Sequence, residues 1–239
     1  MKLGIIADVH GNPTALKLCL QVLKDLDVDE IYFLGDAIGY LPGENDVLDI
    51  LYAAEVNCQK GNHEAMLLGE IAVPEEKDRL YGIHAARERI SRANLEFIRG
   101  WPERREISVD GRKLFLVHGS PEDHLEGYVY SQRDFHTDNK YTYDAVFMGH
   151  THYPFVFDLK GIQVVNVGSC GLPRDQGNLS SFALYDTSVH QTKILRLLFD
   201  SEETIESFQQ ISIPHEVIEC LRRRSPETFG VRINRNNYG

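Results

Sequence analysis

The sequence of 239 residues lacks the features that mark several protein classes. No stretch approaches the roughly 20 consecutive apolar residues of a membrane-spanning helix, so we expect no membrane partner. The cysteines form no Cys-x-x-Cys pair, which argues against a zinc knuckle or a disulfide framework. They are Cys19, Cys58, Cys170 and Cys220. The net charge is −11, which argues against an extended nucleic-acid surface, because neutralising phosphates requires clustered Lys and Arg.

The N-terminal residues and the length of the chain predict its location and its domain organisation. The first residues reach Asp8 too early for a secretory signal, and a cytoplasmic protein is the expectation. The length fits a single domain over 1–239, with a core of about 1–200 and a C-terminal helical extension with a basic tail at 201–239. The tail is predicted to be a solvated segment in preference to a phosphate-binding patch, and it contains Arg222, Arg223, Arg224, Arg232 and Arg235. A homo-oligomer stays open.

Apolar runs alternate with amphipathic stretches in the first part of the chain. Strands are predicted at 2–7, 30–34 and 56–59, and a helix is predicted to follow each, from Pro13, at 45–54 and from Asn62. Strands that alternate with helices through short connections indicate a parallel α/β sheet. Residues 75–100 are predicted to form two helices with a break at 91–94.

After Trp101 the pattern becomes that of a β-rich region. Asp110-Gly111 predicts a hairpin turn, and further strands are predicted at 145–148, 155–159, 163–167, 182–185 and 192–198, with a late helix at 201–209. The predicted architecture is a four-layer α/β/β/α sandwich, in which two mixed β-sheets are flanked by helices. Residues 119–144 have no clear period, and a lid over a site and an ordered surface loop are both open.

Five short polar clusters stand at the ends of apolar runs. They are Asp8-Val9-His10, Gly35-Asp36, Gly61-Asn62-His63-Glu64, His118-Gly119 and Gly149-His150-Thr151-His152. Because the carboxyl ends of parallel strands meet at one edge, we expect one site there. Four imidazoles, two carboxylates and one amide oxygen exceed the needs of one metal and match two metals that share a bridging carboxylate. The metals would make the pocket locally positive, so a small phosphorylated substrate is compatible with an acidic protein.

Together the five clusters resemble those of the calcineurin-like metallophosphoesterase superfamily. Further segments are similar to those of a small bacterial and archaeal, phosphodiesterase-like subgroup. These segments are 35–43, 94–97, 118–121 and 166–175. The sequence departs from the subgroup at Val167 and Cys170, which affects the shape of a loop and not the ligand set. Segment 119–144 has no match, which leaves the substrate open.

The resemblance implies a site with two divalent metal ions. Asp8, His10 and His152 would hold the first, Asn62, His118 and His150 the second, and Asp36 would bridge them. Manganese is expected first, and iron, zinc, cobalt or nickel also suit a site without thiolate. His63 would protonate the leaving oxygen, and substrate contacts would come from Asn62, His63 and Arg174. For Arg174, a position in a surface turn is equally open.

The expected reaction is the hydrolysis of a phosphodiester by attack of metal-bound hydroxide. The first alternative is a phosphomonoesterase, such as a phosphoprotein phosphatase or a dinucleoside-polyphosphate hydrolase. The second is a non-catalytic, metal-binding interaction scaffold, which the intact ligand set disfavours. Five histidines lack this motif context and are predicted to be surface or structural residues: His84, His124, His136, His190 and His215.

Overall fold

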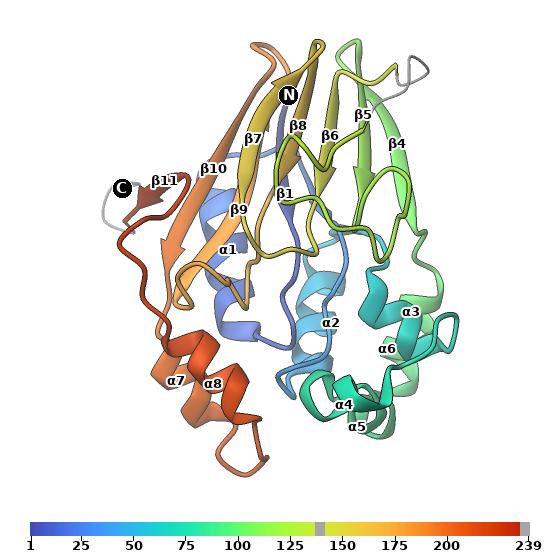
Figure 1. Cartoon of the computed structure of the whole chain (residues 1–239), viewed down its shortest axis with the longest axis vertical. Coiled ribbons are helices and arrows are strands. Elements are labelled where there is room, and N and C mark those ends of the chain that lie inside the picture. The colour runs from blue at the N-terminus through green and yellow to red at the C-terminus, as the bar shows by residue number, and fades with distance from the viewer. Residues whose placement is uncertain (137–141, 235–239) are drawn as a thin grey trace.

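The computed structural model describes residues 1–136 and 142–234 as two stacked β-sheets with helices (Figure 1). Both sheets are mixed, as the sequence predicts. The first sheet has the strand order β11-β10-β9-β1-β2-β3, and the second has the order β4-β5-β6-β8-β7. No helix in these described ranges is long and apolar enough to cross a membrane.

The first sheet is built around a parallel strand–helix unit. Its strands and helices are β1 (Lys2–Ile6), α1 (Pro13–Asp25), β2 (Glu30–Phe33), α2 (Glu44–Ala53) and β3 (Asn57–Cys58). Helix α1 begins where the sequence predicts, because the Asn12 side chain accepts a hydrogen bond from the backbone N–H of Ala15 and Pro13 occupies the first turn. The antiparallel strands β9 (Leu179–Asp186) and β10 (Gln191–Leu198) extend the sheet beyond β1.

The second sheet begins with the predicted hairpin. Its strands are β4 (Arg104–Val109), β5 (Arg112–Val117), β6 (Ala145–Met148), β7 (Phe155–Leu159) and β8 (Ile162–Asn166). Asp110 and Gly111 turn between β4 and β5 with φ of 48° and 75°. Strands β5, β6 and β8 are parallel to one another, so the polar residues that follow β5 and β6 leave the sheet at the same edge.

The stretch 75–100 contains three helices, so the prediction of two is wrong. It contains α4 (Glu75–Tyr81), α5 (Ile83–Arg89) and α6 (Arg92–Arg99), which follow α3 (Asn62–Leu68). Gly82 has a φ of 67° and ends α4, and the Asp78 carboxylate accepts the N–H groups of Ile83 and His84 at the start of α5. Ser91 lies at the predicted break and caps α6.

Apolar side chains alternate between the two faces of the second sheet. Leu114 and Leu116 pack against the first sheet, whereas Phe115 and Val117 lie on the outer face. There the layer that the sequence assigned to helices is made by an irregular segment, whose Val129 and Phe135 are buried against the strands. The described part of 119–144 is therefore an ordered cover, and residues 137–141 lie outside the described residues.

The C-terminal residues return to the first sheet. Helices α7 (Ser201–Ser207) and α8 (His215–Arg222) pack on the same core as α1, and β11 (Val231–Ile233) pairs with β10 in parallel. In Figure 1, α7 and α8 lie on the opposite side of the lower half from α3–α6. The expected solvated tail is thus an ordered helix, turn and strand as far as residue 234. Arg235 lies outside the described residues.

Candidate metal centre

The first two polar clusters lie in the loops that follow β1 and β2, and backbone hydrogen bonds join these two loops. The backbone N–H of Asp8 donates to the Gly35 carbonyl at 3.0 Å, and that of His10 donates to the Asp36 carbonyl at 3.0 Å. Five of the seven predicted ligands have a left-handed backbone, which is costly for residues with a side chain and is typical of functional sites. They are Asp8, His10, Asp36, His150 and His152, with φ between 50° and 64°.

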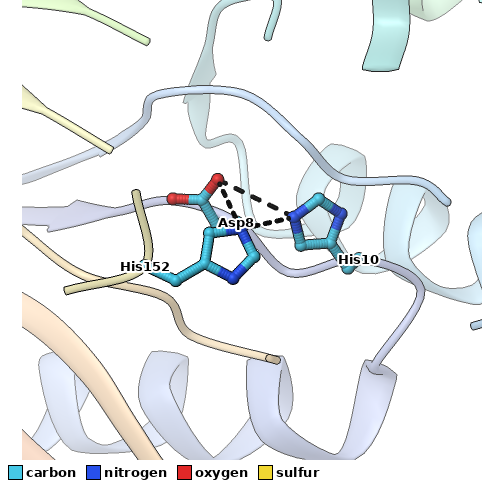
Figure 2. A group of neighbouring side chains, drawn as sticks. All are labelled: Asp8, His10 and His152. Atoms are coloured by element: carbon cyan, nitrogen blue, oxygen red, sulfur yellow. Dashed lines mark hydrogen bonds and ion pairs between the residues drawn. The ribbon is translucent and has the colours of Figure 1, made fainter. Parts of the chain in front are cut away.

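The first group of donors is Asp8, His10 and His152 (Figure 2). The Nε2 atoms of the two rings lie 3.0 Å apart, and Asp8 Oδ1 lies 3.5 Å from the His152 atom and 3.8 Å from the His10 atom. In each ring Nδ1 is hydrogen-bonded to a backbone carbonyl. His10 Nδ1 lies 3.1 Å from the Ile38 carbonyl oxygen, and His152 Nδ1 lies 2.6 Å from that of Leu172. Because a carbonyl only accepts, both Nδ1 atoms carry the proton, and both Nε2 atoms direct lone pairs into the group.

The second group is built from Asp36, Asn62, His118 and His150. His118 Nδ1 is hydrogen-bonded to the Leu34 carbonyl at 3.1 Å, so Nε2 is the ring nitrogen that can offer a lone pair to a metal. That Nε2 atom lies 3.0 Å from Asn62 Oδ1, 3.1 Å from His150 Nδ1 and 3.4 Å from Asp36 Oδ2. Asp36 Oδ2 is also 3.6 Å from His10 Nε2, so the same oxygen faces both groups.

Burial leaves this donor set short of positive charge. Desolvation raises the pKa of Asp8 to about 8, and its Oδ1 atom has no hydrogen-bond partner among the described residues. Burial acts to lower the pKa of His118, but the carboxylate of Asp36 and then that of Asp8 overcome it and raise this pKa to about 9. Asp8 and His118 therefore hold protons where no metal is bound, and divalent cations fit such a pocket because they can replace those protons as the source of positive charge.

His63 also lies beside these donors. With His10 and Asp36 it forms a third group of potential ligand atoms, although its Nε2 atom is 3.9 Å from Asp36 Oδ2. Its Nδ1 atom faces the backbone at Gly39, where a side-chain carbon would approach to 2.2 Å. The ring packs against Tyr40, whose ring centroid is 5.2 Å away, and against Tyr81 at 4.7 Å, and the two tyrosine rings also contact each other at 5.3 Å.

Glu64 supports the centre, and the sequence analysis gave it no role. Its buried carboxylate accepts the N–H groups of Asp36, Ala37 and Gly61, each at 2.8 Å. It therefore ties the loop after β2 to the start of α3, where His63 N–H also donates to Asp36 Oδ1 at 3.0 Å. A glutamate three residues after the residue that precedes a helix is the usual signal for such a contact.

Two further polar side chains hold the ligand loops. The Asn166 amide donates to the Gly149 carbonyl at 2.6 Å, beside His150. The Ser169 hydroxyl donates to the Asp8 carbonyl at 2.6 Å.

Cys170, whose reactivity the sequence left open, is buried, and its sulfur lies 3.4 Å from that of Cys19. Burial raises the pKa of the Cys170 thiol well above its usual range.

The rim of the centre is aromatic and basic. Tyr128, from the cover over the second sheet, places its ring centroid 4.1 Å from that of His150. Arg174 lines the centre and donates to the Tyr40 hydroxyl at 3.3 Å, so it is more than a residue of a surface turn. Of the five other histidines, His84, His136 and His215 are exposed and His124 and His190 are partly exposed, and none lines the centre.

A model of the calcineurin-like phosphoesterase superfamily domain matches residues 1–190. The chain belongs to this superfamily. Its membership confirms the resemblance that the motifs carry, and it makes the protein a metal-dependent phosphoesterase.

The chain is also similar to individual proteins. An uncharacterised protein of Methanocaldococcus jannaschii is 28% identical over 97% of this chain and 96% of its own length. Phosphodiesterase MJ0936 of the same organism is 25% identical over 71% of this chain and 84% of its own length. The crystal structure of a metallophosphoesterase from Sphaerobacter thermophilus has the same fold, with a TM-score of 0.74 at 24% identity over 92% of this chain and 98% of that one.

Proposed function

We propose that the protein hydrolyses phosphodiesters at a centre of two divalent metal ions. The observation that carries the proposal is the position of Asp36 Oδ2, 3.4 Å from His118 Nε2 and 3.6 Å from His10 Nε2. A carboxylate oxygen that faces two separate sets of nitrogen and oxygen donors is the arrangement of a bridging ligand.

The proposed ligand sets follow the two groups. Asp8, His10 and His152 hold one ion, Asn62, His118 and His150 hold the other, and Asp36 bridges them. Manganese is the proposed ion, because the set contains carboxylate, amide and imidazole donors and no thiolate. When bound, the ions would polarise a phosphoryl group and acidify water.

His63 is the proposed general acid. Burial lowers its pKa, although the Asp36 carboxylate opposes that effect, so the ring is neutral before substrate arrives. A bound phosphoester adds negative charge beside the ring and favours its protonated form. Packing against Tyr40 and Tyr81 holds the ring with Nε2 on the side of the centre, 3.9 Å from Asp36 Oδ2, where it can deliver a proton to the leaving oxygen.

Asn62 and Arg174 are the proposed substrate contacts besides His63. Arg174 stands on the rim of the centre and carries a permanent positive charge. Its hydrogen bond to the Tyr40 hydroxyl does not neutralise that charge, because the hydroxyl is uncharged. We propose diesters over monoesters because two relatives over most of the chain are named phosphodiesterases, MJ0936 and YfcE of Escherichia coli. Action on a small phosphoester in the cytoplasm is part of the same proposal.

The test compares two chromogenic esters. Metal-free protein is reloaded with manganese, zinc, cobalt or nickel, and release of nitrophenol is measured from bis-p-nitrophenyl phosphate and from p-nitrophenyl phosphate. We expect the diester to give the higher kcat/KM, with manganese the best ion. A monoester preferred by orders of magnitude would assign the protein to the phosphomonoesterases. No hydrolysis of either ester with any ion would leave the metal-binding scaffold as the better account.

A further inference from the structure

A groove of about 520 Å³ lies beside the metal centre, and the C-terminal region forms one wall. It is lined by Tyr153 from the loop after His152 and by Arg223, Arg224 and Phe229 after α8. Arg174 lines both this groove and the metal centre, so the two are neighbouring parts of one surface. A substrate that occupies the centre can therefore extend into the groove.

The groove is positively charged in a protein whose net charge is −11. Over the described ranges, no ion pair within 4.0 Å involves Arg174, Arg223 or Arg224. Asp175 also lines the groove, but both of its carboxylate oxygens bond the buried guanidinium of Arg196, at 2.6 and 2.8 Å. Glu227 is the one carboxylate of the lining that this pairing does not neutralise. The groove thus has an excess of cationic donors, which favours an anionic ligand.

The arginines are held by backbone groups of the protein. Arg223 Nη1 donates to the Arg174 carbonyl at 2.8 Å, and Arg224 Nη1 donates to the Leu221 carbonyl at 3.0 Å. Arg224 also donates to the Arg223 carbonyl at 2.9 Å and to the Ser201 hydroxyl at 3.3 Å. A guanidinium has five N–H donors, so Arg223 keeps four of them for a ligand and Arg224 keeps two. Both side chains are exposed.

The contact between Arg223 and Arg174 also keeps their charges apart. The guanidinium of Arg223 sits at the backbone of Arg174, whereas the guanidinium of Arg174 reaches the Tyr40 hydroxyl at the rim of the centre. The two charges therefore stand at different points of one surface, with that of Arg174 toward the metal centre and that of Arg223 in the groove.

The rim also offers flat surfaces between these points. Tyr153 is 39% exposed and Phe229 is 47% exposed, and both line the groove. Tyr130 continues this rim toward the centre, with its ring centroid 6.3 Å from that of Tyr153 and 5.9 Å from that of Tyr128. Exposed aromatic rings beside arginines are the usual surfaces on which nucleobases stack.

We propose that this groove is a second phosphate subsite. The substrates are then nucleotide phosphodiesters that carry a further phosphate, one nucleoside away from the bond that is cut. This proposal rests on the phosphodiesterase function proposed above and specifies the class of its substrate.

The test uses two esters that differ by one phosphate. They are thymidine 5′-(p-nitrophenyl phosphate) and the same compound with a 3′-phosphate. The quantity measured is the ratio of their kcat/KM values for nitrophenol release by the manganese-loaded full chain. We expect the wild type to prefer the 3′-phosphorylated ester by about tenfold or more, since charge-assisted hydrogen bonds to a phosphate are worth that much. The ratio should fall toward one in the double variant Arg223→Gln, Arg224→Gln.

The control variant is Arg222→Gln. Arg222 belongs to the same run of arginines but pairs with Glu202 at 2.7 Å and does not line the groove. It should keep the wild-type ratio. The subsite proposal is overturned if the wild type hydrolyses both esters equally well, if the double variant keeps the preference, or if Arg222→Gln loses it. No hydrolysis of either ester would instead overturn the phosphodiesterase function, and the subsite with it.

Discussion

His10 and His152 face each other through their Nε2 atoms at 3.0 Å, and both rings have Nδ1 on a backbone carbonyl. Two lone pairs at this distance repel unless a cation lies beside them. The backbone carbonyls, and not the metal, set the tautomers. The centre is therefore preorganised for cations by the loops that carry it.

Metal removal should destabilise the protein. An ion that binds only the folded state contributes about 2.7 kcal/mol at a hundredfold excess over its Kd, and its loss also leaves the lone pairs and carboxylates uncompensated. We expect dialysis against a chelator to lower the Tm by several degrees and manganese to restore it. Thermal denaturation monitored by circular dichroism measures this. An unchanged Tm after verified removal of the metal would contradict the account.

Metal affinity should rise with pH. Without metal, the pKa of Asp8 is about 8 and that of His118 is about 9, so both carry protons at neutral pH. A bound cation needs the free carboxylate and the free lone pair, so binding releases protons. We expect the apparent affinity for manganese to increase from pH 6.5 to pH 8.5. Calorimetry in buffers of different ionisation enthalpy should detect the released protons, and an affinity independent of pH would refute this reading.

His63→Ala should lower turnover and keep both metals. General acid catalysis typically contributes roughly 10²–10⁴-fold, and its loss matters most for a poor leaving group. The variant should therefore lose far more activity on a methyl ester of a nucleotide than on a p-nitrophenyl ester. His84→Ala is the control, since His84 is exposed, pairs with Asp78 and does not line the centre. Loss of metal from His63→Ala would make His63 a ligand and not an acid.

Glu64→Gln should weaken the fold and the centre together. The carboxylate accepts three backbone N–H groups, and an amide that presents its own N–H to one of them costs roughly 2 kcal/mol. We expect a lower midpoint in urea denaturation and a reduced metal content. Glu96→Gln is the matched control, because Glu96 pairs with Arg99 at 2.7 Å and both side chains are more than half exposed, so its change should cost less than about 1 kcal/mol. Equal effects of the two substitutions would contradict the role of Glu64.

The donor set was predictable because each ligand lies within four residues of the end of a strand. Asp36 and His118 belong to different sheets, yet parallel pairing within each sheet brings their loops to one edge. The cover was not predictable, because Tyr128 reaches His150 only through tertiary packing of a segment without a period. The place of Arg223 was not predictable for a similar reason. A run of arginines indicates a solvated segment, and only the pairing of β11 with β10 and the contact of Arg223 with the Arg174 carbonyl show where that segment lies.

The most direct test of the two-metal account is a titration of metal into stripped protein. Manganese is added to the wild type and to Asp36→Asn while hydrolysis of bis-p-nitrophenyl phosphate and bound metal are both measured. The account predicts that wild-type activity rises with the second equivalent and saturates at two ions per chain, and that Asp36→Asn binds less metal and stays far less active. Full activity of the stripped protein, saturation at one ion, or equal behaviour of the two proteins would contradict it.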